Sequence, residues 1–239
     1  MNLSLQDIQA FRAVIEAGGV NAARGTGDGL SGLLHVTVPV DAMAAFLCTP
    51  IIAFACDHPD LRLEVDLDDR ALDLTAGGYD VAIRIGRLSD GALRARRLGD
   101  SPRMLVASPD YLAAYGTPAR LDDLTDHHAV GYANAAVGQV WRFVGADGAE
   151  RSVRVVPRVA FNNGDAMRAA AVEGLGLIVL PRFIVKADVE AGLLAEVVLP
   201  ERPISDDVHA VYAAGRDTPL KVRAFIDHMF AASRANSDH

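Results

Sequence analysis

The sequence predicts a soluble α/β protein whose helices alternate with the strands of a parallel sheet. The composition is ordinary for a globular protein, with 51% hydrophobic and 23% charged residues. Strand-like and helix-like patterns alternate from Leu33 onward, which indicates strands joined by crossover helices. The chain of 239 residues is long enough for one large domain or for two lobes, each with its own core.

The N-terminal segment is predicted to be helical. Apolar side chains recur at helical spacing in residues 3–17, and Gly18 and Gly19 end this pattern. A second helix begins near Val20 and reaches only Arg24. The glycine-rich stretch 25–32 follows it and predicts a linker.

Strands and helices then alternate up to residue 108. Their apolar patterns predict strands over 33–38, 61–67, 79–85, 93–98 and 103–108. Apolar residues at helical spacing predict a helix over 42–57, with Asp41 placed to cap its N-terminus. A short helix is expected at 71–76.

The rest of the chain continues this alternation. Helices are predicted over 111–115, 166–173 and 218–233, and Pro181 opens a further helix. The turn 162–165 caps the helix that begins at Ala166. Strands are expected over 159–161, 177–180 and 208–213, and segments 140–144 and 152–156 flank the turn 145–148 as a hairpin.

Charge and cysteine content limit the classes of function. The net charge is −8 and the pI is about 5.3, whereas dedicated nucleic-acid-binding domains carry a basic surface. Cys48 and Cys56 lack the spacing of metal ligands, so buried and unreactive thiols are expected. No apolar run approaches the ~18–20 uncharged residues that a bilayer span needs, and no signal peptide is recognised. We therefore expect a cytoplasmic protein with no membrane partner.

The sequence predicts no catalytic or metal-binding constellation. Gly25-x-Gly-x-Gly29 follows no strand and precedes no Lys-Ser or Lys-Thr pair, so it does not match a phosphate-binding loop. Ser108 lacks the Gly-x-Ser-x-Gly context of a nucleophile elbow. His127 and His128 are adjacent, which favours structural roles, and Asp66, Asp68 and Asp69 are expected to be solvated at a strand end. We expect no catalytic residue, no metal, no cofactor and no enzymatic activity.

The order of motifs along the chain resembles one known family. The segments that carry the resemblance are Gly32-Leu-Leu-His-Val-Thr-Val-Pro39, Phe54-x4-Pro59-Asp-Leu-Arg-Leu63, Gly78-Tyr-Asp-Val-Ala-Ile-Arg-Ile-Gly86, Leu105-Val-Ala-Ser-Pro-Asp-Tyr-Leu112, Gly164-Asp-Ala-Met-Arg168 and Glu173-Gly-Leu-Gly-Leu-Ile-Val-Leu-Pro181. Together they resemble the effector-binding domain of LysR-type transcriptional regulators. Residues 2–24 resemble the opening of the same family's winged helix-turn-helix.

The resemblance implies two α/β lobes with a parallel-rich sheet each, joined by two crossover strands, as in type 2 periplasmic binding proteins. An effector-binding domain would cover 33–235, with lobe I over 33–105 and 209–235 and lobe II over 106–208. The crossovers would lie at 104–108 and 208–212. The family also implies a homodimer, in which the helix over 42–57 of one copy lies near lobe II of the other.

A small-molecule effector is expected between the lobes, where loops at the carboxyl ends of strands lead into helices with free N–H groups. Four segments are expected to converge there: Pro39, Val40, Asp41 and Ala42; Arg84, Ile85 and Gly86; Val106, Ala107 and Ser108; and Asn162, Asn163, Gly164 and Asp165. Bulky substitution at Ala42 or Gly86 is then expected to block binding without destabilising the unliganded protein.

Asp41 bears on the chemistry of this effector. In many family members a serine or threonine at this helix N-terminus holds an effector carboxylate, which an ionised Asp41 would repel by about 1–4 kcal/mol. Alternatively, Asp41 caps its own helix, and this interpretation is favoured. Arg84 and Arg87 are placed to supply compensating positive charge, unless Arg84 pairs with a structural carboxylate.

The N-terminal part departs from the family pattern. The family continues from its opening helix into a recognition helix, a wing and a long dimerising helix, whereas here residues 1–24 lead directly into 25–32. The remnant 1–24 is also net neutral. We therefore expect a LysR-type regulator, or a truncated form of one, that senses a small molecule but does not bind promoter DNA specifically. The alternative is a cytoplasmic solute-binding protein without a regulatory role.

Overall fold

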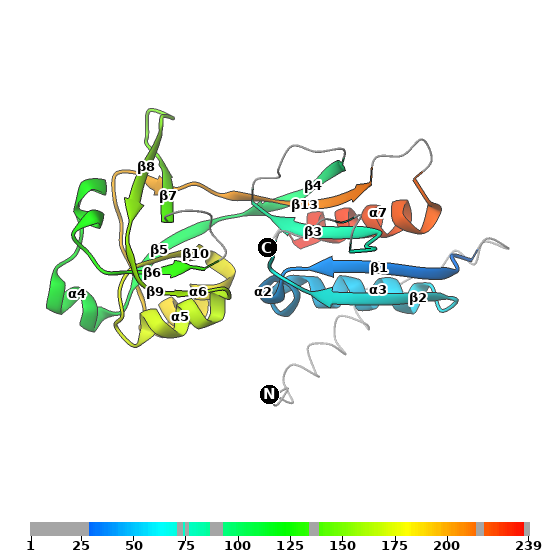
Figure 1. Ribbon diagram of the computed structural model, residues 1–239, viewed down its shortest axis with the longest axis horizontal. Coiled ribbons are helices and arrows are strands. Elements are labelled where there is room, and N and C mark those ends of the chain that lie inside the picture. Colours follow the sequence, from blue (N-terminus) through cyan, green and yellow to red (C-terminus); the bar gives the residue numbers. More distant parts are fainter. Residues whose placement is uncertain are drawn as a thin grey trace.

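The chain forms two lobes, each built from its own sheets and helices and joined by two passages of the chain (Figure 1). This computed structural model describes residues 29–70, 74, 77–86, 93–133, 139–213 and 218–236. The predicted helices at 3–17 and 20–24, the first half of the linker 25–32, most of the segment 71–76 and Arg87 lie outside the described residues.

The first lobe contains a five-stranded sheet in the order β2-β1-β3-β13-β4. Its strands are β1 (Gly32–Val38), β2 (Leu61–Leu67), β3 (Val81–Ile85), β4 (Leu93–Ser101) and β13 (Asp206–Ala213). β1 is parallel to β2 and β3, whereas β13 is antiparallel to both β3 and β4. The sheet is therefore mixed and not parallel-rich as predicted, because a strand from the C-terminal part of the chain is inserted between two earlier strands.

Helices of the first lobe pack against this sheet and share its core. The helix predicted over 42–57 is confirmed as a continuous segment of α2 (Val40–Ala42), the wider turn η1 (Met43–Leu47) and α3 (Cys48–Asp57). Near it lies α7 (Leu220–Asn236). The rings of Phe54 and Phe225 meet edge to face at 5.2 Å between α3 and α7, and both side chains are fully buried. Aromatic burial of this kind holds the two helices together.

The helical segment Val40–Asp57 is long and apolar enough, by length and composition alone, to cross a membrane. The segment includes Asp41 and Asp57, so it does not contradict the expectation that no uncharged run reaches such a length. Its residues Leu47, Ile51 and Phe54 belong to the lobe's core, as in a helix of a globular domain. Only 22% of the segment is buried, however, and Ile52 and Cys56 are exposed. The expected burial of Cys56 is therefore wrong, and a helix face with apolar side chains is left uncovered.

The second lobe is formed by the continuous segment between Arg103 and Pro203. Its strands are β5 (Arg103–Ala107), β6 (Ala129–Tyr132), β7 (Gln139–Val144), β8 (Glu150–Val155), β9 (Pro157–Phe161), β10 (Ile178–Pro181), β11 (Ala195–Glu196) and β12 (Arg202–Pro203). Its helices are α4 (Pro109–Tyr115), η2 (Leu121–Thr125), α5 (Gly164–Val172) and α6 (Arg182–Glu190). β5 is antiparallel to β10 and β11, whereas β6 is parallel to β9, so this lobe is mixed as well.

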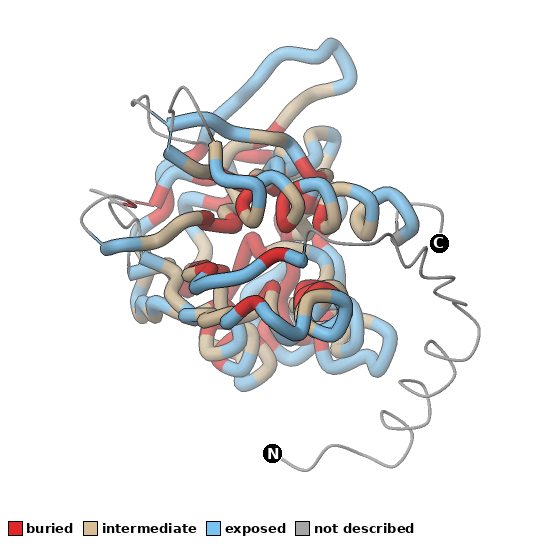
Figure 2. Tube along the Cα trace, turned by 90° about the vertical axis from the view of Figure 1, so that its right-hand side faces the viewer, coloured by how far each residue is buried: buried red, intermediate tan, exposed pale blue. Residues whose placement is uncertain are grey.

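Alternation along β5 and β10 places hydrophobic side chains on both faces of the central sheet. Leu105 and Val179 face a core that contains Trp141 and Phe143 of the predicted hairpin, which is confirmed as β7 and β8. Val106 and Ile178 face the opposite way, toward a core shared with α5 and α6. The tube in Figure 2 shows these buried stretches inside the lobes and exposed stretches on the outer sides of helices and loops.

The chain passes between the lobes at two neighbouring points. It leaves the first lobe between Ser101 and Arg103 and returns between Pro203 and Asp206. Asp206 pairs with Ser101 in the sheet, so the two passages lie side by side. The ranges expected for the crossovers, 104–108 and 208–212, lie a few residues further on, within β5 and the residue that follows it and within β13.

Candidate functional site

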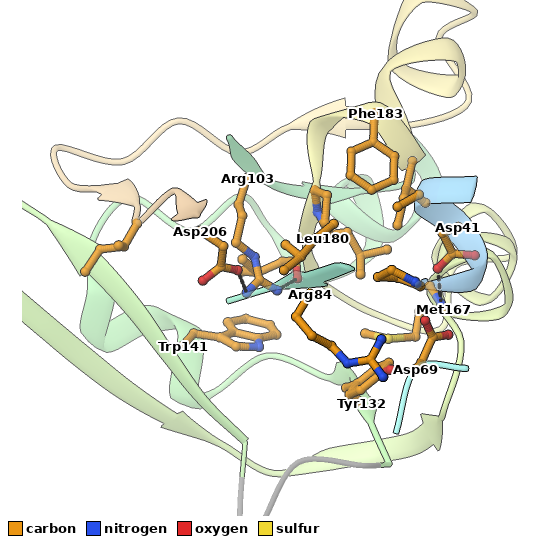
Figure 3. Close-up of a pocket in the computed structure, with 18 of the residues that line it drawn as sticks. Asp41, Asp69, Arg84, Arg103, Tyr132, Trp141, Met167, Leu180, Phe183 and Asp206 are labelled. Atoms are coloured by element: carbon orange, nitrogen blue, oxygen red, sulfur yellow. Dashed lines mark hydrogen bonds and ion pairs between the residues drawn. The ribbon is translucent and has the colours of Figure 1, made fainter. Parts of the chain in front are cut away.

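A cavity of about 350 Å³ lies between the two lobes beside these passages. Figure 3 shows side chains from both lobes directed into it. The lining residues are Pro39, Asp41, Ala42, Asp68, Asp69, Arg84, Ile85, Arg103, Tyr132, Gln139, Val140, Trp141, Arg142, Gly164, Met167, Val179, Leu180, Pro181, Phe183, Ile184, Ile204 and Asp206. A concave site of this size, with apolar walls and a few charged groups, is typical of small-molecule binding.

One end of the cavity contains two arginines that share one carboxylate. Arg103 Nη1 donates to Asp206 Oδ2 at 3.0 Å, and Arg103 Nη2 donates to the carbonyl oxygen of Val179 at 2.7 Å. Arg142 lies 3.8 Å from the other oxygen of Asp206. Among the described residues, Arg103 Nε and Arg142 Nη1 are buried without an acceptor. This end therefore has unused hydrogen-bond donors and more positive than negative charge.

Arg84 projects into the cavity from the end of β3. Its guanidinium donates to the Ile83 carbonyl at 2.9 Å and to Thr37 Oγ1 at 3.3 Å, both of which are uncharged. In the described part of the chain it has no carboxylate within ion-pair distance, so the suggested structural ion pair is not found among these residues. Burial lowers the pKa of Arg84, and the nearby Asp68 and Asp69 offset part of this effect.

The opposite end contains two helix N-termini, and protein carboxylates bind both. Val40 N–H, at the start of α2, donates to Asp69 Oδ1 at 3.0 Å. Gly164 N–H, at the start of α5, donates to Asp41 Oδ2 at 2.9 Å, and Asn163 Nδ2 donates to Asp41 Oδ1 at 2.9 Å. The favoured interpretation that Asp41 caps its own helix is therefore wrong, because its carboxylate reaches the helix of the other lobe instead.

Asp69 is half-buried rather than solvated as expected. Burial raises its pKa, and repulsion from Asp41 and Asp68 adds to the rise. Asp68 behaves differently, because hydrogen bonds from Arg70 lower its pKa to about 2. The aspartates at this end thus differ, since Asp68 forms an ion pair with Arg70, whereas Asp69 accepts from Val40 N–H and has Arg84 as a more distant positive charge.

The sequence comparison decides the family. The family described as the LysR substrate binding domain matches residues 27–234, which is most of the chain. The chain belongs to the LysR family of transcriptional regulators. This result confirms the resemblance seen in the sequence motifs and agrees with the expectation of a protein without enzymatic activity.

Relatives within the LysR family support the same assignment. An uncharacterized HTH-type transcriptional regulator of Haemophilus influenzae is 34% identical over 193 residues, which cover 81% of this chain and 67% of that protein. The regulator CrgA of Neisseria meningitidis is 30% identical over 191 residues, which cover 78% of this chain. The chain spans only 62% of the length of CrgA.

A solved LysR-type regulatory domain has the same fold. The CrgA regulatory domain from Neisseria meningitidis matches with a TM-score of 0.69 and 27% identity, over 84% of this chain and 98% of that structure. This match confirms the predicted α/β, periplasmic-binding-protein-like architecture, with the correction that the sheets are mixed.

The structure brings some of the expected site residues to the cavity and leaves others away from it. Those that line it are Pro39, Asp41, Ala42, Arg84, Ile85 and Gly164. Val40 and Asn163 contribute through their hydrogen bonds to Asp69 and Asp41. Gly86, Asn162 and Asp165 lie outside the lining. Val106, Ala107 and Ser108 are buried in the second lobe, where Ser108 caps α4 by accepting from Tyr111 N–H.

Two charged residues that line the cavity, Arg103 and Asp69, were not predicted from the sequence to do so. Arg103 lies in the cavity because the crossover occurs at 101–103, earlier than expected. The parallel pairing of the first two strands indicates where Asp69 lies. Val38 pairs with Leu67, so Asp69 stands beside Val40, two residues further along each strand.

The expectation for bulky substitutions at Ala42 and Gly86 does not hold. Ala42 is fully buried in the core of the first lobe, so a larger side chain there would disrupt packing. Gly86 has a φ of +109°, which other residues adopt only with strain. Both variants would destabilise the protein itself, so cavity-blocking variants must come from exposed positions.

Proposed function

We propose that this chain acts as the effector-binding part of a LysR-type transcriptional regulator, in the cytoplasm, where promoter DNA is found. A small molecule binds in the cavity between the lobes and biases their relative position. The observation that carries this proposal is the convergence of charged and apolar side chains from both lobes on one cavity of about 350 Å³. A ligand that contacts both lobes stabilises one arrangement of them by its differential affinity.

Val140→Trp is expected to abolish ligand-induced stabilisation. Val140 lines the cavity from β7 and is 47% exposed, so a tryptophan fills the cavity without crowding the core. A small-molecule extract of bacterial cells is expected to raise the melting temperature of the unmodified chain, because ligand binding stabilises the folded state by RT ln(1 + [L]/Kd). The variant is expected to show no such rise in differential scanning fluorimetry.

Val156→Trp serves as the matched control, since Val156 is 85% exposed between β8 and β9 and lies outside the cavity. It should respond to the extract as the unmodified chain does. Stabilisation that persists in Val140→Trp would place the ligand elsewhere. The absence of any stabilisation in the unmodified chain would contradict the proposed function.

We propose further that this polypeptide alone does not bind promoter DNA specifically. Residues 1–24 resemble only the opening of a winged helix-turn-helix, and the chain has a net charge of −8. Specific recognition requires an element in the major groove, and non-specific affinity requires basic groups against phosphate. In mobility-shift titrations at physiological salt, its affinity for its own upstream region is expected to equal its affinity for a scrambled duplex. Selective binding at nanomolar concentration would refute this expectation.

The exposed apolar face of Val40–Asp57 supports a homodimer of the effector-binding domains. Ile52 is 39% exposed at this face, among small apolar neighbours. Apolar patches of this kind mark association surfaces. Ile52→Glu is expected to raise the dimer dissociation constant by at least about tenfold in analytical ultracentrifugation, since the carboxylate would be desolvated at the interface. Val156→Glu is the control, and equal effects of both variants would count against this surface.

A further inference from the structure

Asp41 occupies the position that a ligand anion would otherwise take. Its carboxylate leaves α2 in the first lobe and accepts hydrogen bonds from Asn163 Nδ2 and Gly164 N–H in the second lobe, at 2.9 Å each (Figure 3). The first N–H groups of a helix have no partner within the helix and favour negative charge. The protein therefore supplies its own carboxylate to the N-terminus of α5.

Space at this point is already filled. A Cβ atom added to Gly164 would lie 2.5 Å from Asp41 Oδ2 and 2.7 Å from Ile184 Cδ1. A ligand carboxylate could reach Gly164 N–H only by displacing Asp41. The N-terminus of α2 is bound in the same way by Asp69. The first N–H group of each helix is therefore already bound by a protein carboxylate.

At the aspartate end of the cavity, Asp41 and Asp69 place two carboxylates against the single guanidinium of Arg84, which leaves an excess of negative charge. Within the described residues, neither carboxylate has a cation within ion-pair distance. Burial raises the pKa of Asp69 and repulsion from Asp41 and Asp68 adds to the rise, whereas the hydrogen bond from Val40 N–H and the positive charge of Arg84 offset only part of it. A cationic group from a ligand would reduce the repulsion between these carboxylates and form an ion pair with them.

The arginine end has the opposite requirement. Asp206 is shared between Arg103 and Arg142, and one buried nitrogen on each arginine lacks an acceptor in the described structure. A buried donor without a partner is costly, so an oxyanion that accepts from it is favoured. In Figure 3, Arg103 and Asp206 lie on one side of the cavity and Asp41 and Asp69 on the other, with Leu180 between them.

We propose that the effector is a small zwitterion, with an ammonium group beside Asp41 and Asp69 and a carboxylate beside Arg103 and Arg142. An apolar spacer between the two charges lies against Leu180 and Trp141. This inference deepens the proposed function and rests on it. Asp41 is the residue that determines specificity, because its charge decides which sign of ligand charge the aspartate end accepts.

Three probes of equal chain length test the assignment: 5-aminopentanoate, 1,5-diaminopentane and glutarate. Isothermal titration calorimetry on the full chain is expected to give 5-aminopentanoate a dissociation constant at least about tenfold below those of the other two. Asp41→Asn keeps the size of the side chain and removes its charge. This variant is expected to reduce the preference for 5-aminopentanoate over glutarate by about tenfold or more.

Asp165→Asn is the matched control, since Asp165 lies in the first turn of α5, the helix whose N-terminus Asp41 binds, and outside the cavity. It is expected to leave all three dissociation constants unchanged. Glutarate that binds the unmodified chain as tightly as 5-aminopentanoate would overturn the proposal. So would an unchanged preference in Asp41→Asn, or the failure of all three probes to bind.

Val140→Trp separates this inference from the proposed function. Suppose that the unmodified chain binds glutarate more tightly than 5-aminopentanoate, and that Val140→Trp binds neither. This result overturns only the zwitterion assignment, because the cavity still binds a ligand. Binding that survives Val140→Trp overturns both, because the ligand then lies outside the cavity. The expected result is that the unmodified chain prefers 5-aminopentanoate by about tenfold over the other two probes and that Val140→Trp no longer binds it.

Discussion

Gly176→Ala is expected to lower the free energy of unfolding by more than about 3 kcal/mol. Gly176 has a φ of +144°, and a Cβ atom there would lie 2.3 Å from the carbonyl oxygen of His128. That carbonyl cannot move away cheaply, because it accepts from Leu177 N–H at 2.8 Å while Val130 N–H donates to Leu177 at 3.0 Å. The substitution therefore separates two backbone segments in the centre of the second lobe.

Gly192→Ala is the control for Gly176→Ala, because it introduces backbone strain without a steric contact. Gly192 has a φ of +73° but no atom within 4 Å of the added Cβ. It is expected to cost only about 1 kcal/mol. Urea unfolding of both variants, followed by circular dichroism, measures the difference. Similar losses for the two variants would show that the contact with His128 is not the cause.

Asp206→Ala is expected to destabilise the protein by about 2–4 kcal/mol. Its side chain is only 13% exposed and compensates two guanidinium groups, Arg103 at 3.0 Å and Arg142 at 3.8 Å. Removing it leaves two neighbouring positive charges that repel each other at the passage between the lobes. The loss is below that of a fully buried pair, because both arginines retain about 30% exposure.

Asp207→Ala is the control for this prediction, because Asp207 is the next residue and forms an ion pair with Arg97 at the surface. Exposed pairs of this kind contribute about 0–1 kcal/mol. Chemical denaturation at moderate salt is expected to separate the two variants clearly. Equal destabilisation would mean that the shared carboxylate is no more important than an ordinary surface pair.

Local patterns predicted most elements of the fold but not the pairing of the strands. The strand over 208–213 and the strand over 93–98 were both expected from their own residues. Nothing in either pattern indicates that β13 inserts between β3 and β4, because strand pairing depends on contacts more than a hundred residues apart in sequence. The short strands β11 and β12 escaped prediction, since two residues cannot show a period.

The position of the cavity between the lobes was predictable, whereas the side-chain contacts inside it were less so. The resemblance placed the effector between the lobes, and Asp41, Arg84 and Gly164 do line a cavity there. The direction of the Asp41 side chain was not predictable, because the N-terminus of its own helix and that of α5 offer the same kind of N–H donor. Asp69 binds the first of these, and Asp41 is thereby left to bind the second.

Because β13 lies between β3 and β4, the first lobe cannot complete its sheet until the ribosome has delivered Asp206–Ala213. The second lobe is continuous in sequence and emerges from the ribosome before that point. At about 5–20 residues per second, β3 and β4 wait on the order of ten seconds for their common neighbour. Their unpaired edges are open to wrong pairing during this time. The pairings of β13 with β3 and β4 can therefore form only after the whole of the second lobe has been synthesised.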